Sequence, residues 1–261
     1  MSGAVLYAVQ GGVATITFNR PEILNALDGG MIAQLREACE RAERDVAVRV
    51  IVLRGAGPAF LAGGNVAIFH ANLPRMPQMV TEIAGELHRA VLALRRALKP
   101  VVASVHGAVA GAGVSLVAAA DFVIAAADAQ FTLAYSRIGA SPDGGATWFL
   151  PRLVGYHKAL ELMLLSEAVD AATMRDLGLV NRVVPAADLE QETQRIAARL
   201  AMGPTLAYAA TKRLANQAFD LALAEHLDEE ARTFARCAST RDFAEGVTAF
   251  VEKRKPVFRG E

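Results

Sequence analysis

The feature that most limits how this chain can fold is a repeated order of apolar strand, glycine-rich segment and helix in its first half. Strand-like runs occupy residues 48–53, 101–105 and 122–125. Glycines follow each of the first two runs, and residues with helical spacing come next. Alternation of this kind favours an α/β fold whose strands run largely parallel.

Local signals define the elements around these strands. Two short apolar runs within residues 5–18 flank a pair of glycines, which predicts a β-hairpin. Apolar residues at helical spacing predict a helix over residues 28–44, with Asp28 as its N-cap. A second apolar stripe predicts a helix over residues 80–98 that ends before Pro100.

The second half of the chain reads differently from the first. From about Asp143 onward the pattern is mostly helical, apart from one strand-like run at residues 179–184. No low-complexity linker separates the two parts. We therefore expect a core of residues 1–200 and a helical C-terminal region of residues 201–261, packed on the core or on a neighbouring subunit.

Composition excludes several classes of protein. Apolar residues make up 53% of the chain and charged residues 21%, enough for a large buried core. Lysine plus arginine equals aspartate plus glutamate at 27 each, so no overall charge favours nucleic acid or an anionic membrane. Residues 101–120 carry no formal charge, but three glycines interrupt them, so we expect strand, loop and helix rather than a membrane span. We expect no nucleic-acid and no membrane partner.

The cysteines and the start of the chain indicate a reducing compartment. Cys39 and Cys237 fall in segments that read as helices, and neither has a partner at metal-ligand spacing. The opening residues lack a basic stretch followed by an apolar run, so no signal peptide is expected. We predict a cytoplasmic protein without a metal site.

Three glycine-rich segments, residues 55–69, 107–116 and 141–155, stand at junctions that lead into helices. Glycine lets the backbone approach a ligand closely and leaves amide N–H groups free at a helix N-terminus. None of the segments reads G-x-G-x-x-G or G-x-x-x-x-G-K-[ST], so they do not indicate nucleotide binding.

Together with Asn19-Arg20-Pro21 near the start and the closing FVEKRKPVF, these segments resemble the enoyl-CoA hydratase/isomerase (crotonase) superfamily. The resemblance implies an α/β spiral of repeated ββα units with a helical C-terminal trimerisation region. It also implies a homotrimer or a dimer of trimers. The substrate would be an acyl-CoA thioester, with no cofactor beyond the coenzyme A that the substrate carries. Within the superfamily, the motifs most resemble those of the ring-epoxide isomerase of phenylacetate degradation.

By this resemblance, the backbone N–H groups of Gly64 and Ala112 polarise the thioester carbonyl. Pre-oriented amides in a dry pocket stabilise an oxygen that gains negative charge in the transition state. The short helix expected to begin near Gly113 would add the positive end of its dipole. Gly64 and Ala112 are therefore candidate catalytic residues.

The candidate base is Asp143. Hydratases of the superfamily carry two glutamates that activate one water, and the matching positions here are Ser115 and Tyr135. Neither side chain is a carboxylate base at neutral pH. Asp143 matches the acidic position that some isomerases of the superfamily use. An alternative is that Ser141 and Pro142 start a helix there and that Asp143 only interacts with its dipole.

The resemblance also implies which residues contact the acyl-CoA. The expected set comes from the segment before the first helix, the first two glycine segments, the position of Tyr135 and the C-terminal helix, the last from this or a neighbouring subunit: Ala26, Leu27, Ala62, Gly63, Asn65, Ile68, Gly111, Tyr135, Phe250 and Lys253. Relatives commonly have aspartate at the position of Asn65, and asparagine can make similar turn hydrogen bonds.

The remaining residues near the motifs have structural interpretations. We expect His106 to be a hydrogen-bonded loop histidine, Ser115 to pack on its helix, and residues 148–150 to lie in the core. The leading functional hypothesis is a double-bond or ring isomerase of an enoyl-CoA or aryl-acetyl-CoA that uses one aspartate. The alternatives are an enoyl-CoA hydratase of fatty-acid or aromatic-acid degradation and a non-catalytic acyl-CoA-binding scaffold.

Overall fold

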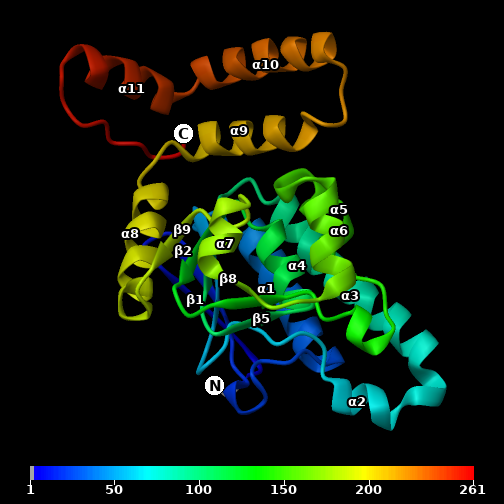
Figure 1. The fold of residues 1–261 in the computed structure, drawn as a ribbon. Coiled ribbons are helices and arrows are strands. Elements are labelled where there is room, and N and C mark those ends of the chain that lie inside the picture. The colour runs from blue at the N-terminus through cyan, green and yellow to red at the C-terminus, as the bar shows by residue number, and fades with distance from the viewer. Residues whose placement is uncertain (1–2) are drawn as a thin grey trace.

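The computed structural model describes residues 3–261 as two β-sheets with helices around them (Figure 1). The larger sheet has the strand order β1-β2-β3-β4-β6-β9 and the smaller one β5-β7-β8. The strands are β1 Val5–Gln10, β2 Val13–Phe18, β3 Val50–Gly55, β4 Val101–Val105, β5 Ala108–Ala110, β6 Phe122–Ala126, β7 Gln130–Thr132, β8 Val169–Asp170 and β9 Arg182–Val184.

The helices fill the connections and dominate the second half of the chain. They are α1 Gly29–Arg44, α2 Val66–Ala71, α3 Met76–Arg96, α4 Ala112–Ala119, α5 Ala146–Val154, α6 Tyr156–Leu165, α7 Ala171–Asp176, α8 Leu189–Ala201, α9 Thr205–Gln217, α10 Leu223–Ala238 and α11 Arg241–Val251. The side chain of Asp28 accepts a hydrogen bond from the Met31 N–H at 2.8 Å, as expected for the N-cap of α1.

The larger sheet confirms the predicted mixture of one hairpin and parallel strands. β1 and β2 pair antiparallel, and β2, β3, β4, β6 and β9 are parallel neighbours. All five residues of β4 are buried, because helices cover both faces of a parallel sheet. The continuous apolar run at residues 101–105 therefore marks a central strand.

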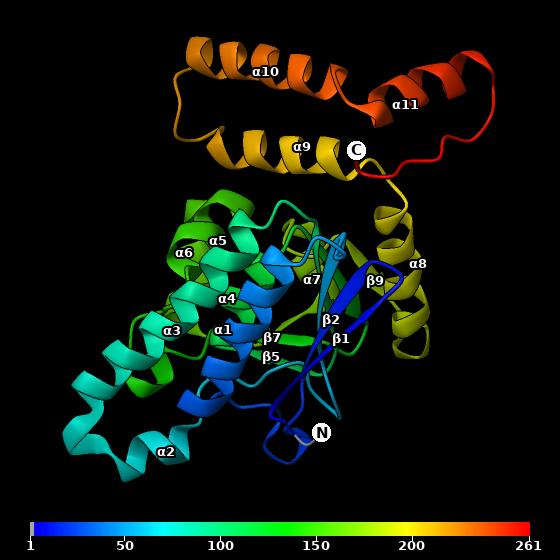
Figure 2. The ribbon, with the colours of Figure 1, turned by 180° about the vertical axis from the view of Figure 1, so that it is seen from behind.

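Helices cover the larger sheet on both sides (Figures 1 and 2). In β3, Ile51 and Leu53 face the main core with α1 and α3, while Val50 and Val52 face a smaller core under α8. A buried hydrogen bond of 2.8 Å between the hydroxyls of Ser104 and Thr193 links β4 to α8. The first two glycine-rich segments, which form part of the candidate site, follow the ends of β3 and β4.

The last three helices form a layer beyond one end of the core (Figures 1 and 2). Lys212 of α9 donates from Nζ to the Leu94 carbonyl oxygen at 2.8 Å and pairs with Asp121 at 2.7 Å. Burial lowers the pKa of this ammonium group. Further out, Phe234 on α10 and Phe250 on α11 are 68% and 85% exposed, so one chain leaves much of this layer's apolar surface uncovered.

Several predicted boundaries differ from the structure. The strand expected at residues 48–53 begins at Val50, and the run at residues 179–184 pairs only from Arg182 to Val184. The strands of the smaller sheet were not predicted, because runs of two or three residues are defined by their partners and not by local pattern. Among the helices of residues 3–261, none has the length and apolar sequence that crossing a bilayer requires.

Candidate active site

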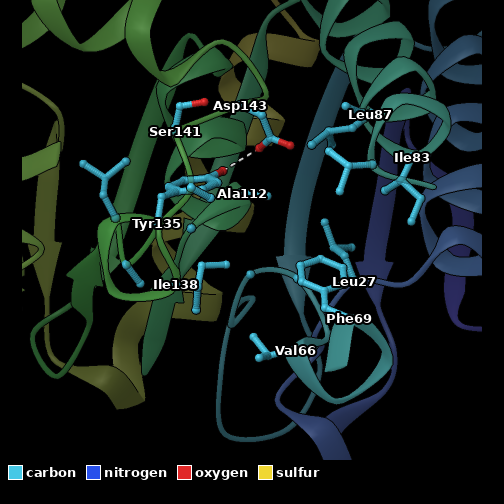
Figure 3. A pocket seen from close by; sticks show the side chains of 18 of the residues that line it. Leu27, Val66, Phe69, Ile83, Leu87, Ala112, Tyr135, Ile138, Ser141 and Asp143 are labelled. Carbon is cyan, nitrogen blue, oxygen red and sulfur yellow. Dashed lines mark hydrogen bonds between the residues drawn. The ribbon is translucent and has the colours of Figure 1, made fainter. Parts of the chain in front are cut away.

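A cavity of about 540 Å³ opens between α3, the first two glycine segments and the loop that precedes α5 (Figure 3). Its wall is mainly apolar, and the side chains that form it include Leu27, Ile32, Val66, Phe69, Val80, Ile83, Leu87, Leu133 and Ile138. The polar side chains in the wall belong to Tyr135, Arg137, Ser141 and Asp143. Asp143 is therefore the one carboxylate among the lining residues.

The first glycine segment is fixed by the loop that follows β2. Asn25 is fully buried, and its amide nitrogen donates to the Ala59 carbonyl oxygen at 2.8 Å. Leu27 then donates from its N–H to the Gly63 carbonyl oxygen at 2.7 Å, and Asn65 donates back to the Leu27 oxygen at 2.8 Å. The sequence Asn25–Leu27 thus holds the backbone around Gly64 in place.

The second glycine segment has a backbone conformation that requires glycine. Gly111 has φ 50° and ψ −119°, and its Cα packs against Gly63, so that an added Cβ would be 3.4 Å from the Gly63 Cα. Helix α4 starts directly afterwards at Ala112, one residue earlier than expected, and its cap has no side chain to accept a hydrogen bond. The two glycine segments therefore meet at the cavity.

Two backbone donors remain free where the segments meet. Gly64 and Ala112 both line the cavity, and neither N–H donates to another residue within the described part of the chain. The Ala112 amide also belongs to the N-terminal turn of α4, where the helix dipole favours negative charge. A pair of unused donors of this kind can bind an oxygen that becomes negatively charged.

The structure contradicts the alternative in which Asp143 belongs to a helix start. Helix α5 begins at Ala146, and its cap is Gly145 in a left-handed conformation with φ 87°. Ser141 and Pro142 precede the helix in an irregular loop. The Asp143 side chain is consequently not a helix cap but projects from this loop toward the cavity (Figure 3).

Two hydroxyl groups contact Asp143. Tyr135 donates from Oη to Asp143 Oδ1 at 2.6 Å, and Ser115 donates from Oγ to the Asp143 backbone oxygen at 2.8 Å. Burial, followed by the negative charge of Asp143, raises the pKa of the Tyr135 phenol above its usual value. Ser115 is fully buried, as expected for packing, but its hydrogen bond also holds the loop that carries the carboxylate.

The other predicted contact residues divide between the cavity wall and its support. Leu27, Ala62, Gly63, Gly111 and Tyr135 line the cavity, whereas Ala26, Asn65 and Ile68 do not. The Asn65 side chain caps α2 by accepting from the Ile68 N–H at 3.3 Å, which confirms that asparagine can serve in this turn.

Some predicted residues lie elsewhere. Phe250 lies in the last turn of α11 and Lys253 follows its end, and neither residue lines the cavity of its own chain. His106 donates from Nε2 to the Gly57 carbonyl oxygen at 2.8 Å and does not line the cavity, so its structural interpretation holds. The core assignment of Trp148 was wrong: it is 41% exposed under the Arg152 guanidinium, although its neighbours Phe149 and Leu150 are buried.

Most of the apolar wall of the cavity has no recognisable signal in the sequence. Ile83 and Leu87 belong to the predicted stripe of α3, but the helical spacing does not distinguish a face against the core from a face along a cavity. Ile138 lies in a short 3-10 helix, Ser136–Ile138, with no periodic signal. The candidate polar residues were therefore easier to predict from the sequence than the apolar wall around them.

The arrangement suits carbonyl chemistry. Two free N–H groups can stabilise a developing oxyanion, and a carboxylate nearby can accept a proton from the adjacent carbon. Within residues 3–261, no group of three or more His, Cys, Asp or Glu side chains is arranged to hold a metal ion.

Comparisons with known proteins agree with this chemistry. A model of the enoyl-CoA hydratase/isomerase family matches residues 8–261. A Rhodobacter capsulatus protein named "Probable enoyl-CoA hydratase" is 40% identical over 259 residues, 98% of each chain. The 1,2-epoxyphenylacetyl-CoA isomerase of Escherichia coli K12 is 37% identical over 259 residues, again 98% of each chain.

A solved structure shows the same architecture. The crystal structure of an enoyl-CoA hydratase from Polaromonas sp. JS666 matches with a TM-score of 0.93 at 38% identity, over 98% of this chain and 99% of that one. Because a hydratase and an isomerase are similarly close, the expected special closeness to the ring-epoxide isomerase is not established. The chain belongs to the enoyl-CoA hydratase/isomerase family and has its α/β crotonase fold, with two sheets and C-terminal helices.

Proposed function

We propose that this protein is an isomerase of an enoyl-CoA or aryl-acetyl-CoA thioester in which Asp143 is the only acid–base group. The observation that carries the proposal is that Asp143 is the one carboxylate in the cavity wall, which also contains Gly64 and Ala112. Ser115 and Tyr135, at the positions that correspond to the hydratase glutamates, both donate their hydroxyl protons to Asp143.

The mechanism follows from these groups. The N–H groups of Gly64 and Ala112 donate to the thioester oxygen, which acidifies the α-carbon. For a 3-enoyl thioester, Asp143 removes an α-proton, and the electron pair of that C–H bond forms a dienolate. The same carboxyl group returns the proton to the γ-carbon, the double bond moves to the 2-position, and the carboxylate is regenerated. One proton carrier is enough because no water is consumed.

A hydratase is the second candidate, and the similarity to hydratases favours it. Water addition ordinarily needs a second group to position the water. The two side chains nearest Asp143, Ser115 and Tyr135, are hydroxyls and not carboxylates. Both already donate their protons to Asp143, so neither is free to position a water. A non-catalytic acyl-CoA-binding scaffold, the third candidate, would not need a carboxylate and two unused amides in the wall of one cavity.

The assembly is part of the proposal. We infer a trimer or a dimer of trimers in which the helical region of residues 201–261 contacts neighbouring subunits through its uncovered apolar side chains, including Phe234 and Phe250. Phe250 and Lys253 of a neighbour would then complete the coenzyme A site, since they do not reach the cavity of their own chain. Lysine is a suitable partner for the coenzyme A phosphates.

The deciding experiment compares wild type with Asp143→Asn on 3-enoyl-CoA, an aryl-epoxide thioester and crotonyl-CoA. We expect wild type to isomerise at least one of the first two, and the variant to lose about 10²–10⁴-fold in kcat with little change in binding. Exchange of the α-proton in heavy water should fall in parallel. Retained exchange and turnover in Asp143→Asn would remove Asp143 from the mechanism, and hydration of crotonyl-CoA alone would favour the hydratase.

A further inference from the structure

The protons of the two hydroxyls beside Asp143 can be assigned individually. Ser115 has one hydroxyl proton, and it goes to the Asp143 backbone oxygen at 2.8 Å. The Tyr135 proton goes to Asp143 Oδ1 at 2.6 Å, because a carboxylate oxygen can only accept. The 3.5 Å approach of the Ser115 and Tyr135 oxygens therefore has no proton left to form a hydrogen bond.

The two oxygens of Asp143 are consequently not equivalent. Oδ1 accepts from Tyr135, while no residue in the described chain donates to Oδ2. Figure 3 shows the second oxygen directed away from Tyr135, toward the side of the cavity formed by Leu87. The oxygen that faces the apolar space is the one without a partner.

The backbone before Tyr135 has an unfavourable conformation that directs this side chain. Ala134 has φ 49°, a left-handed conformation that costs a non-glycine residue roughly 1–2 kcal/mol. Directly after it, the Tyr135 N–H donates to the Leu133 carbonyl oxygen at 2.6 Å, closing a tight turn at the end of β7. Strained residues persist where the surroundings hold them, often beside functional groups.

We propose that Tyr135 is a positioning residue that binds one oxygen of Asp143, so that the other oxygen alone carries the proton between the two carbons of the substrate. This inference rests on the proposed isomerase function. The donated hydrogen bond stabilises the ionised carboxylate and fixes its rotation. The high pKa of the phenol keeps Tyr135 a donor throughout the neutral range.

Few other groups compete for this role. α3 presents the apolar side chains of Ile83 and Leu87 to the cavity, whereas Ser115 of α4 is buried behind the wall and donates to the Asp143 backbone oxygen. Arg137 is the one cationic side chain among the lining residues, and its guanidinium donates to the Ser166 carbonyl oxygen. Tyr135 is thus the single side chain that hydrogen-bonds the carboxylate in the described structure.

The experiment uses two variants that each remove one hydroxyl from Asp143. Tyr135→Phe removes the donor to the carboxylate, and Ser115→Ala removes the donor to the backbone. For 3-enoyl-CoA isomerisation we expect Tyr135→Phe to lower kcat by roughly 10–100-fold with little change in KM. The acidic limb of its pH–rate profile should move to higher pH, because the ionised base has lost a stabilising hydrogen bond.

Ser115→Ala should lower kcat without moving the acidic limb, since its hydroxyl does not touch the carboxylate. Tyr156→Phe is the matched control, because Tyr156 is exposed and away from the cavity. Should Tyr135→Phe not fold, replacing tyrosine by 3-fluorotyrosine makes the phenol a stronger donor, and the limb should then move to lower pH.

An unchanged acidic limb in folded Tyr135→Phe, or an equal shift in Ser115→Ala, would overturn the inference. So would an unchanged limb in the fluorinated protein. Asp143→Asn, assayed alongside, distinguishes failure of the proposed isomerase function from failure of the proposed role of Tyr135. If that variant stays active, the proposed function itself fails. If it is inactive while the limb of Tyr135→Phe stays in place, only the role of Tyr135 fails.

Discussion

Gly144 lies so close to Ser115 that a methyl group on its Cα would come within 2.9 Å of the Ser115 Cβ. The contact packs the loop of Asp143 directly onto α4, and it explains why the residue after the carboxylate is a glycine with φ 60°. The position of Asp143, the proposed base, thus depends on a backbone contact as well as on hydrogen bonds.

Gly144→Ala should therefore displace the base. We expect a loss of about 2–4 kcal/mol in the free energy of unfolding from the left-handed backbone and the overlap, together with a fall in kcat larger than in KM. Gly139→Ala is the matched control, since it also has positive φ but meets no atom within 4 Å. It should cost about 1–2 kcal/mol and leave kcat unchanged. Equal activity in the two variants would contradict the positioning role of the contact.

Ala112→Pro tests the second amide donor. Proline is tolerated at the first position of a helix, and the N–H that it removes binds no other residue of the described chain. We expect kcat to fall about 10²–10³-fold while a non-reactive acyl-CoA still binds. Ala171→Pro, at the first position of α7, is the control with a buried alanine outside the cavity. Unchanged kcat in folded Ala112→Pro would exclude this amide from the oxyanion site.

Stability should depend on an ion pair of α8 in acid. Hydrogen bonds from Arg195 and Arg182 lower the pKa of Glu192 to about 2. Because the folded-state pKa lies below the unfolded-state value, the stabilisation is complete above the unfolded pKa of about 4.3 and is lost as pH falls toward 2. In wild type, the urea concentration at the midpoint of unfolding should fall as the pH is lowered across that interval. Glu192→Gln should make this fall smaller. Glu167→Gln should keep the wild-type decline, and an identical slope in both variants would refute the prediction.

The exposed apolar layer predicts an oligomer with functional consequences. Light scattering at micromolar concentration should give at least three times the 27.6 kDa of one chain. Phe250→Asp should reduce that mass and weaken acyl-CoA binding, since Phe250 is 85% exposed in one chain and is expected in a neighbour's site. Phe122→Asp, a partly exposed phenylalanine on the core, is the control for a surface charge. A wild-type monomer would contradict the proposed assembly.

The sequence predicted those elements whose signals are local. The strand at residues 101–105 and the cap at Asp28 were predicted to the residue. A strand buried on both faces appears as a continuous apolar run, and a side-chain cap appears as an aspartate before the apolar helical pattern. The candidate oxyanion residues, Gly64 and Ala112, came from resemblance and do line one cavity with Asp143. Their catalytic roles stay predictions.

What the sequence did not predict depends on contacts between distant segments. Ser141 and Pro142 carry a strong local helix-start signal, yet α5 begins only at Ala146. Gly144 and Gly145 intervene with left-handed backbone conformations, and they pack closely against Ser115 of α4 and against Phe149. The pairing of Tyr135 with Asp143 could not be inferred from a spacing of eight residues, since it requires the turn at Ala134.

Ser115, Tyr135 and Asp143 belong to a helix, a turn and a loop, yet each approaches the other two. Ser115 Oγ lies 2.8 Å from the Asp143 backbone oxygen and 3.5 Å from Tyr135 Oη, and Tyr135 Oη lies 2.6 Å from Asp143 Oδ1. The proposed oxyanion donors, by contrast, are main-chain groups that no substitution of a neighbouring side chain removes. Under the proposed mechanism, the reaction could change by moving the acidic group among these three positions, while the main-chain amides of Gly64 and Ala112 stay in place.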